Sequence, residues 1–537
     1  MTASRDVRIL LIGGTGVFGS RLATGLRKMP GLTVVAAGRG PANDVRLDRA
    51  APDLATRIAA QTPDIVIDAA GPFQTYGADP YAVARAAIDA GAHYLDLSDD
   101  AAFTAGIATL DPAARAAGVA AISGVSSVPA LSSAAVEALR ADLTDIHLIE
   151  SVILPGNRAP RGLSVMRAIL AQAGRPVTIW RAGRPQDVAG WGDLRRIRLP
   201  GLGPRWTSVI GAPDLALFPD RYGARTVTFR AGLEMSLLHL GLWALSLPVR
   251  TGLIRSLEPA ARPMRRVADL FEPFGTDRGG MRVRVIGRGP KGAVRRDWTL
   301  LAEAGDGPHI PALPGRIMVA KLLAGQVAPG ARACLGEFTL AEARDKSADL
   351  ALTFATDEAS ITPVFARALG PAHAELPPSV RDLHDVLHRR RWSGTASVER
   401  GTGLVARLIC AIMRFPPAAG RVPVTVDKHR HGDTENWTRD FGGRRFRSHL
   451  RADTRPGCVT ERFGALTFRI RLTPTAEGLA YPVEAGRLGP IPIPRALLPR
   501  SDTLEAAEGQ AATFDVALSM PFVGPLVRYR GRIASVG

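Results

Sequence analysis

The segment Ile9-Leu-Leu-Ile-Gly-Gly-Thr-Gly-Val-Phe-Gly-Ser-Arg-Leu22 has the glycine spacing of a dinucleotide-binding loop. It fits Gly14-x-Gly16-x-x-Gly19 and, in a second register, Gly13-x-x-Gly16-x-x-Gly19. Glycines at this spacing let the backbone turn sharply, bring its N–H groups close to a pyrophosphate and pack the next helix against the strand. We therefore expect cofactor phosphates to be bound by Gly13, Gly14, Thr15, Gly16, Val17, Phe18 and Gly19.

Arg39 lies 20 residues after Gly19, at the end of a second apolar run. An acidic residue at this position would hydrogen-bond the ribose hydroxyls of NAD, whereas arginine suits the 2′-phosphate of NADP through its charge and planar donor fork. We expect NADP as the cofactor and consider NAD the less favoured choice. The alternative is that Arg39 is only a solvated loop residue.

Hydride transfer usually also needs a group that supplies or removes a proton. No lysine follows a tyrosine at Tyr-x-x-x-Lys spacing; Tyr81 with Arg85 is the nearest arrangement, and arginine does not easily take the role of lysine. Tyr94 and Asp96 are the candidate catalytic residues, although each could instead only brace its loop. His309 lies in a Gly/Pro-rich loop that could fold over the cofactor or could simply form a capped turn.

A doubly wound parallel sheet is needed to position these residues. Over the first 150 residues, short apolar runs alternate with segments of helical periodicity, the pattern of a Rossmann α/β fold. The predicted strands are Arg8–Ile12, Thr33–Gly38, Val45–Leu47, Ile65–Gly71, His93–Leu97 and Val119–Ser123. Ligands bind beyond the carboxyl ends of such strands. That edge adds Asp48, Ala69, Ala70, Gly71, Pro72, Phe73 and Ser98 to the predicted cofactor site.

Two further segments, Asp68-Ala-Ala-Gly-Pro-Phe-Gln-Thr-Tyr-Gly77 and Gly91-Ala-His-Tyr-Leu-Asp-Leu-Ser98, resemble the reductase-like branch of the saccharopine dehydrogenase family. The resemblance implies an NAD(P)-dependent oxidoreductase in which Gly71 and Phe73 close over the cofactor near its nicotinamide. It continues through Gly124–Pro129 and Pro155–Pro160 and returns at Gly305–Pro311, so that it covers about two thirds of the chain. The resemblance does not indicate the substrate, because members of the superfamily act on chemically different compounds.

The most apolar segment, Met235–Val249 (MSLLHLGLWALSLPV), is shorter than the roughly 20 residues that span a bilayer. Burial is the favoured interpretation, while a wall of an apolar substrate pocket and an interfacial anchor are the alternatives. An enzyme for amino acids would be expected to present a polar pocket in this region. We therefore expect a small-molecule substrate that is apolar or lipid-like.

Beyond about residue 363, several short motifs, among them Arg391-Trp-Ser-Gly394 and Tyr529-Arg-Gly531, resemble the domain-of-unknown-function 4166 family. One apolar helix over Leu404–Phe415, followed by short alternating runs broken by Gly and Pro, predicts an antiparallel sheet curved around a helix. Such a sheet could hold a small apolar ligand, and a purely structural role fits equally well. Trp437, Arg439 and Phe441 share one strand face, which suits core packing and ligand contact alike. The marks of the family are Arg391-Trp-Ser-Gly394, Gly401-x-Gly403, Asn436-Trp-Thr-Arg-Asp-Phe-Gly-Gly443 and Tyr529-Arg-Gly531.

The length of 537 residues requires several domains. We expect an α/β protein with a Rossmann NAD(P)-binding domain over residues 1–150, an α+β substrate and dimerisation domain over 151–362, and a C-terminal α+β domain with a curved antiparallel sheet over 363–537. Self-association as a homodimer would use the middle domain.

The formal net charge of +18 is divided as −4, +12 and +10 among these three segments. A basic excess spread so widely is typical of a solvated surface, so we expect no nucleic-acid partner; anionic substrates or an anionic membrane surface are the alternative. His384-x-x-x-His388 and His429-x-His431 lack nearby acidic or thiol ligands, so we expect no metal. The three scattered cysteines and the absence of an apolar leader favour a cytoplasmic location, with membrane association left open.

Together these patterns predict an NADP-dependent oxidoreductase that reduces a C=O, C=N or C=C bond. The rival hypothesis is a non-catalytic NADP-binding sensor or scaffold, whose C-terminal domain binds a ligand or partner. Both remain open because the sequence contains no unambiguous proton donor.

Overall fold

The structure, a computed structural model, describes residues 6–160 and 162–536. The chain divides into two compact units. The N-terminal unit contains Met1–Trp180, Pro185–Val285 and Arg295–Ala359, and the C-terminal unit contains Arg181–Arg184, Ile286–Val294 and Ser360–Gly537. The N-terminal unit thus contains residues 1–150 and most of residues 151–362, and residue 150 falls inside strand β7 (Asp145–Leu154).

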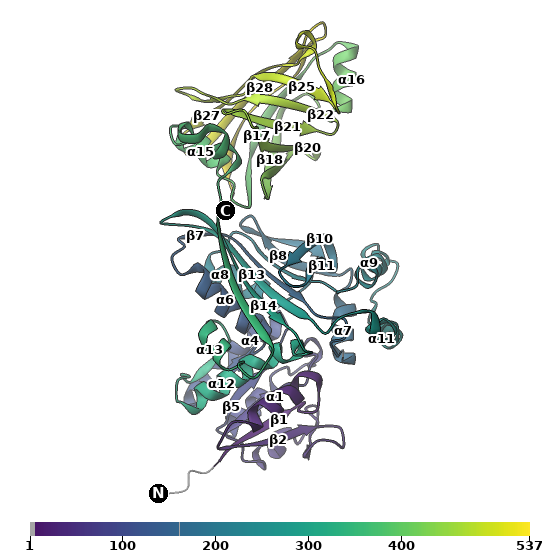
Figure 1. The fold of residues 1–537 in the computed structure, drawn as a ribbon, viewed down its shortest axis with the longest axis vertical. Helices are drawn as coiled ribbons and strands as arrows, with labels where there is room; N and C mark the ends of the chain where they lie inside the picture. Colours follow the sequence, from purple (N-terminus) through teal and green to yellow (C-terminus); the bar gives the residue numbers. More distant parts are fainter. Residues whose placement is uncertain (1–5, 161, 537) are drawn as a thin grey trace. The chain divides into compact units, whose positions relative to one another are not determined.

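A seven-stranded parallel sheet begins the N-terminal unit (Figure 1). Its order, β15-β6-β5-β4-β1-β2-β3, contains the 3-2-1-4-5-6 arrangement of a Rossmann fold and confirms the predicted fold class. The strands are β1 (Val7–Ile12), β2 (Leu32–Gly38), β3 (Val45–Arg46), β4 (Ile65–Asp68), β5 (His93–Asp96), β6 (Ala120–Ser123) and β15 (Gly330–Ala333). The helices of this region are α1 (Val17–Arg27), α2 (Leu54–Ala59), α3 (Ala82–Asp89), α4 (Ala101–Gly106), α5 (Asp111–Ala116) and α6 (Ser132–Arg140).

Apolar side chains cover both faces of this sheet. Along β1, Ile9 and Leu11 belong to one apolar cluster and Leu10 and Ile12 to another. Because successive side chains of a strand point to opposite faces, a strand covered on both sides is an uninterrupted apolar run. The run before the glycine turn is therefore a central strand, which holds the turn rigidly at its carboxyl end.

Residues far beyond 150 complete the Rossmann layer. Strand β15 pairs in parallel with β6, and helix α12 (Leu313–Leu323) packs on α1, where Gly315 lies against Leu22. The four-residue β15 has neither the length nor the periodicity that identifies a strand in a sequence, so its place in this sheet could not be predicted.

The second sheet of the N-terminal unit is mixed, with the order β10-β11-β12-β7-β13-β14-β16; β8 also pairs with β12, and β9 pairs with β8. Its further strands are β8 (Pro176–Arg181), β9 (Arg184–Ala189), β10 (Gly192–Leu199), β11 (Gly203–Val209), β12 (Val227–Ala231), β13 (Gly279–Gly289), β14 (Gly292–Ala302) and β16 (Leu352–Ser360). The accompanying helices are α7 (Leu163–Gln172), α8 (Pro213–Tyr222), α9 (Ser236–Leu245), α10 (Leu247–Arg250), α11 (Ala261–Leu270) and α13 (Leu340–Asp345). This is the expected α+β architecture.

The apolar segment 235–249 forms α9 and α10. His239 and Leu242 are buried, and the His239 ring accepts or donates a hydrogen bond with Ser208 at 3.0 Å. Leu237 and Leu245 are exposed, so burial, the favoured interpretation, holds for one face only. Among the described residues, no helix has both the length and the apolar character needed to cross a membrane.

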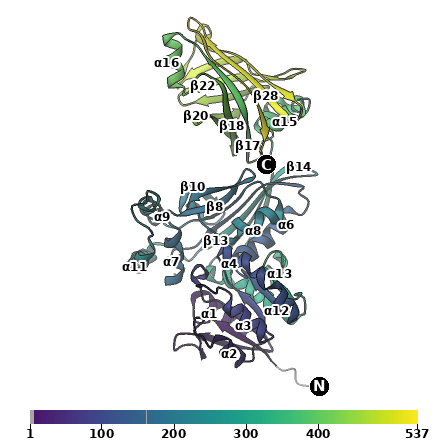
Figure 2. The same ribbon diagram turned by 180° about the vertical axis from the view of Figure 1, so that it is seen from behind.

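The C-terminal unit is built on a thirteen-stranded antiparallel sheet that curves strongly (Figure 2). The strands are β17 (Arg389–Arg400), β18 (Ala419–His431), β19 (Thr434–Phe441), β20 (Arg444–Ala452), β21 (Cys458–Phe463), β22 (Leu466–Arg471), β23 (Thr473–Pro474), β24 (Gly478–Ala480), β25 (Val483–Leu488), β26 (Ile491–Pro492), β27 (Arg500–Glu508), β28 (Ala511–Met520) and β29 (Gly524–Ser535). The helices are α14 (Val364–Leu369), α15 (Pro378–His384) and α16 (Leu404–Ile412). The predicted curved sheet and its apolar helix are both confirmed.

Candidate functional site

The glycine turn lies between β1 and α1, at the point where the strand order of the parallel sheet reverses. Gly13 has a left-handed φ of +77°, and a Cβ there would lie 2.8 Å from the backbone carbonyl carbon of Ala69. The Gly16 N–H donates to Gly13 O at 2.9 Å and closes the turn. Only a residue without a side chain allows this close approach of the β1 and β4 loops.

The first turn of α1 offers its backbone to an anion. Gly16 is the N-cap and has no side chain to occupy the free N–H groups, and the first turn, Val17–Ser20, contains no acidic residue. A Cβ on Gly19 would collide with Gly13 O, so this glycine brings the helix onto the strand. Thr15 is exposed, whereas Val17 and Phe18 are half-buried. The seven residues Gly13–Gly19 thus form one continuous turn at the start of α1, and their binding of cofactor phosphates stays a prediction.

Arg39 directly follows the last residue of β2. Its side chain is exposed and has no ion-pair partner among the described residues. Asp48, two residues beyond β3, is also exposed and accepts the Ala50 N–H at 3.1 Å. Arg39 is therefore a free cation at the sheet edge where the adenosine ribose of a dinucleotide lies in Rossmann folds.

The loop after β4 is held in place by Asp68 and Arg49, two residues that were not predicted from the sequence to belong to the site. The buried Asp68 carboxylate accepts the Tyr76 hydroxyl at 2.8 Å and the Ala70 N–H at 2.9 Å. Arg49 stacks 3.5 Å above the Tyr76 ring centroid and donates to Ala70 O at 2.5 Å. Because β4 ends at Asp68, before the predicted end at Gly71, residues 69–72 are loop, and Phe73 begins a short 3-10 helix, Phe73–Thr75. The loop lies close to the glycine turn, since a Cβ on Gly13 would meet Ala69 and Ala70.

Phe73 turns its ring into the protein. The ring is buried and stacks on Tyr76 at 4.8 Å between centroids, with Phe103 at 5.0 Å. Ala69, Ala70, Gly71 and Pro72 are half-buried and form the open part of the loop. The position near nicotinamide that the family resemblance implies for Gly71 and Phe73 stays a prediction.

Tyr94 and Asp96, on β5, are both fully buried. Tyr94 lies in an apolar cluster, and burial raises the pKa of its hydroxyl well above the usual range. Asp96 Oδ1 accepts three hydrogen bonds, from Ser98 N, Ser123 Oγ and Gly124 N, at 2.8 to 2.9 Å. Among the described residues its Oδ2 has no partner, and burial raises the Asp96 pKa to about 7.

Ser98 braces the same strand end. Its hydroxyl accepts the Asp100 N–H at 3.2 Å and the Thr104 hydroxyl at 3.1 Å. In the parallel register Asp96 pairs with Asp68, so two buried carboxyl groups lie side by side at the ends of β4 and β5. The Ser98 hydrogen bonds stabilise the end of this strand. The catalytic roles of Tyr94 and Asp96 stay predictions.

His309 lies in a short 3-10 helix, Gly307–Ala312, that packs on α1. Burial lowers the pKa of the His309 ring. The charge of Asp306 raises this pKa again in part, whereas Arg21 of α1 lowers it further. The loop therefore reaches α1.

Among the described residues, no group of three or more His, Cys, Asp or Glu side chains is arranged to hold a metal ion.

Comparisons with known proteins give different results for the two ends of the chain. A family model described as a domain of unknown function, DUF4166, matches residues 376–533 and confirms the resemblance of the C-terminal part. None of the curated proteins matches the chain. The resemblance of the N-terminal unit to saccharopine dehydrogenases stays a prediction.

Several solved structures are distantly similar. GenD2 from gentamicin A biosynthesis, in complex with NAD, shares 15% identity over 66% of this chain and 98% of its own, with a TM-score of 0.31. C. glutamicum DAP dehydrogenase in complex with DAP shares 17% identity over 62% and 94%, with a TM-score of 0.35. An engineered D-amino acid dehydrogenase bound to NADP+ shares 17% over 62% and 93%, with a TM-score of 0.33. Similarity at this level says nothing about the substrate or reaction of this chain.

Proposed function

We propose that the protein is an NADP-dependent oxidoreductase of the saccharopine dehydrogenase-like type, acting in the cytoplasm. The observation that supports this most strongly is the combination of the Gly13–Gly19 cradle with the unpaired Arg39 at the end of β2. A cradle of backbone N–H groups fits a pyrophosphate, and a nearby free arginine fits a 2′-phosphate.

In this proposal, backbone N–H groups of Gly14, Thr15, Val17 and Phe18 bind the pyrophosphate and Arg39 binds the 2′-phosphate. The loop Ala69–Phe73 flanks the nicotinamide, which supplies hydride exchange when it is bound. Asp68, Tyr76 and Arg49 hold this loop in place through the bonds described above. Asp96, whose pKa of about 7 suits a group that gains or loses a proton near neutrality, is the favoured proton carrier.

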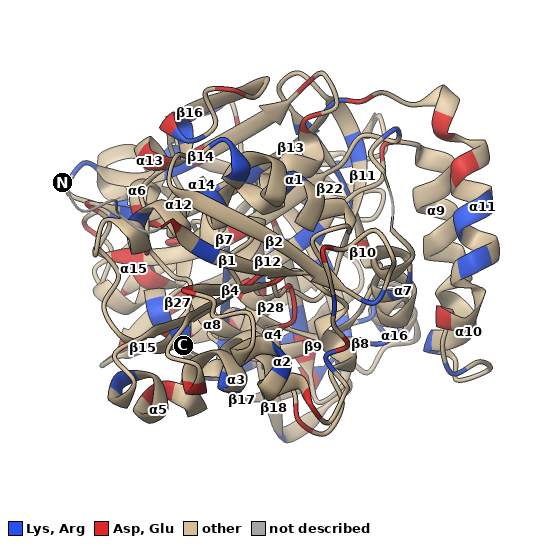
Figure 3. Ribbon diagram, turned by 90° about the horizontal axis from the view of Figure 1, so that it is seen from below, with Lys and Arg blue, Asp and Glu red and all other residues tan. Residues whose placement is uncertain are grey.

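We infer an apolar substrate with a C=O, C=N or C=C bond, and peripheral contact with a membrane, from the helices α9–α11. Leu237, Leu253 and Leu270 are exposed in the segment 236–270 that contains these helices. Helix α11 also carries three arginines, Arg262, Arg265 and Arg266 (Figure 3). Exposed apolar side chains next to arginines suit an anionic lipid surface. A homodimer formed through the mixed sheet belongs to the same proposal.

The cofactor assignment is tested by titrating NADPH and NADH against the full chain and its Arg39→Asp variant. We expect the variant to weaken NADPH binding by about 1–3 kcal/mol, because a charged hydrogen bond is lost and a repulsive carboxylate is added, and to change NADH binding much less. Arg196→Asp, at an exposed arginine of β10, is the matched control and leaves both affinities unchanged. Equal losses for both cofactors would remove the reason for choosing NADP.

The second candidate function is a non-catalytic NADP-binding sensor. The burial of Tyr94 and Asp96 favours it, since neither side chain reaches solvent. Turnover of NADPH with a panel of apolar ketones, imines and enones separates the two functions. Oxidation that is lost in Asp96→Asn while NADPH binding persists supports the enzyme, whereas NADPH binding without oxidation of any substrate supports the sensor.

A further inference from the structure

The curved sheet of the C-terminal unit encloses a cavity of about 400 Å³. Small-molecule sites typically have volumes of ~300–1,000 Å³ and mostly apolar walls, whereas close-packed protein interiors leave few voids larger than a water molecule. The walls come from β18–β22 on one side and β27–β29 on the other, and Ile409 and Met413 of α16 and its following turn also contribute. Every lining residue belongs to the C-terminal unit.

Trp437, Arg439 and Phe441, which the sequence placed on one strand face, all line this cavity. The Arg439 guanidinium donates to Ser448 Oγ at 2.9 Å and to Glu461 Oε1 at 3.2 Å, and it lies 4.8 Å from the Trp437 ring centroid. These contacts use two of the five N–H donors of the guanidinium. Arg439 therefore retains hydrogen-bonding capacity on the cavity wall.

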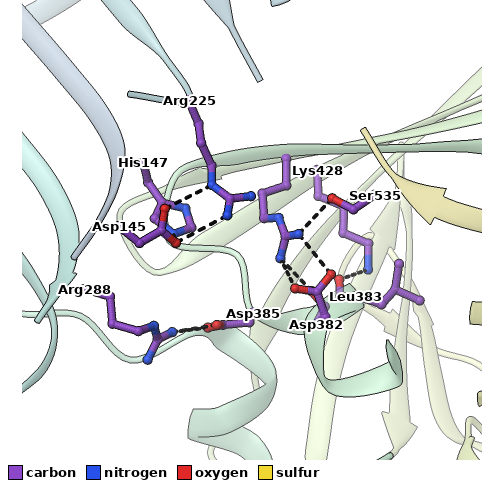
Figure 4. Close-up of polar contacts among 10 residues, drawn as sticks. Asp145, His147, Arg225, Arg288, Asp382, Leu383, Asp385, Lys428 and Ser535 are labelled. Atoms are coloured by element: carbon purple, nitrogen blue, oxygen red, sulfur yellow. Dashed lines mark hydrogen bonds and ion pairs between the residues drawn. The ribbon is translucent and has the colours of Figure 1, made fainter. Parts of the chain in front are cut away.

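A second cation in the wall, Lys428, is already satisfied by the protein. Its side chain is 1% exposed, and its ammonium donates to Leu383 O at 2.8 Å (Figure 4) while lying 3.5 Å from the Trp437 ring centroid. The Glu505 carboxylate, also in the wall, pairs with His384 Nε2 at 2.6 Å and accepts the Tyr481 hydroxyl. Burial lowers the pKa of Lys428 to about 7, and Lys428 and Arg439 share the wall with Glu461 and Glu505, so the protein already places charges of both signs around the cavity.

The Tyr529 hydroxyl is a second group of the wall, besides Arg439, with hydrogen-bonding capacity to spare. The residue is 7% exposed and lines the cavity, and among the described residues its hydroxyl has no hydrogen-bond partner. Arg439, Glu461 and Glu505 are close enough to influence its pKa, which burial raises to about 12. The hydroxyl therefore keeps its proton at physiological pH. Because Tyr529 lines the cavity, a ligand oxygen there can accept the hydrogen bond that this hydroxyl donates.

We propose that this cavity binds an uncharged, apolar ketone or aldehyde, whose carbonyl oxygen accepts hydrogen bonds from Tyr529 and Arg439. An ionised head group would add a buried charge without compensation, which disfavours carboxylates and amines. A pure hydrocarbon would leave the Tyr529 hydroxyl unsatisfied. Binding here does not depend on the proposed reductase activity, because the cavity lies wholly within the C-terminal unit.

The test measures binding to the full chain by calorimetry with three probes of equal chain length: 2-decanone, decanoate and decylammonium. We expect 2-decanone to bind at least 10-fold more tightly than either charged probe. If decanoate or decylammonium binds as tightly as 2-decanone, or if no probe binds at millimolar concentration, the proposal is wrong.

Two variants locate the binding. Tyr529→Phe keeps the ring, which packs on Phe441 and Phe514, and removes only the donor, so we expect 2-decanone to bind roughly 3- to 10-fold more weakly. Val516→Trp, on the strand next to Tyr529, fills the cavity and should abolish binding. Tyr222→Phe is the matched control, since Tyr222 is a buried tyrosine of the N-terminal unit whose hydroxyl also lacks a partner among the described residues.

Wild-type affinity in Tyr529→Phe would overturn the proposal even if Val516→Trp failed to fold. NADPH affinity should be unchanged in Tyr529→Phe, so the inference and the proposed oxidoreductase function can fail separately. Circular dichroism spectra and melting curves of each variant establish that the fold is retained.

Discussion

At the scale of single residues, burial decides which ionisable groups of the candidate site can change their charge. Asp96 is enclosed at the end of β5 and its pKa rises to about 7, although three donors to Oδ1 stabilise the charged form. Desolvation is the larger effect, as expected for a carboxyl group with no cation in contact. Asp214, with two serine donors, shows the same behaviour away from the glycine turn.

The raised pKa of Asp96 predicts a stability difference that depends on pH. The folded protein keeps a proton on Asp96 up to about pH 7, whereas the unfolded chain loses it near the ordinary value of ~3.9. Folding is therefore favoured at low pH, and this contribution is lost as the pH rises from about 4 to 7. Asp96→Asn removes the titration, so urea unfolding between pH 4.5 and 8 should show a shallower decline, by up to a few kcal/mol.

The Asp96 prediction is contradicted if the two proteins lose stability in parallel over this range. Asp214→Asn is the control, since it should flatten the profile in the same direction while leaving NADPH affinity unchanged.

At the scale of elements, the turn between β1 and α1 depends on backbone that approaches backbone. Gly13 and Gly31 share a left-handed φ, of +77° and +73°, but only Gly13 lies against another loop. A side chain at Gly31 meets no atom within 4 Å, whereas one at Gly13 meets Ala69 and Ala70. Substitutions at the two glycines therefore distinguish the cost of a side chain at a positive φ from the cost of a collision with another loop.

Gly13→Ala should weaken NADPH binding at least tenfold, because the loop after β4 must move away from the cofactor cradle. Gly31→Ala carries the strain of a positive φ alone and should lower stability by about 1 kcal/mol with unchanged NADPH affinity. Calorimetric titration and thermal melting measure both effects. Equal NADPH affinity in the two variants would mean that the cradle does not contact the cofactor.

At the scale of the whole molecule, two compact units each carry one candidate ligand site. A ligand that binds only the folded state of one unit raises the stability of that unit by about 2.7 kcal/mol at 100 times its Kd. We expect NADPH to raise the melting temperature of one calorimetric transition and 2-decanone to raise that of another. A single transition shifted equally by both ligands would show that the units unfold together.

Much of the N-terminal unit could be predicted because its signals are local. The glycine turn, the apolar strand before it and the helix after it are encoded within residues 7–27, where spacing alone indicates backbone geometry. Arg39 could be selected for the same reason, since its distance from Gly19 follows from one helix and one strand. Arg49 and Asp68 were missed because their roles arise from contacts with Tyr76 and Ala70, which no spacing rule describes.

The alternation of strands and helices in the first 150 residues, the glycine turn and the strand face shared by Trp437, Arg439 and Phe441 could be predicted from the sequence, because each depends on neighbours along the chain. Three features became visible only in the folded chain: β15 completes the parallel sheet, Tyr94 and Asp96 are buried, and the strand face with Arg439 lines a cavity. These outcomes depend on distant pairings such as that of β17 with β29. A periodic pattern reports which side chains share a face, but what covers that face depends on segments far away in the chain.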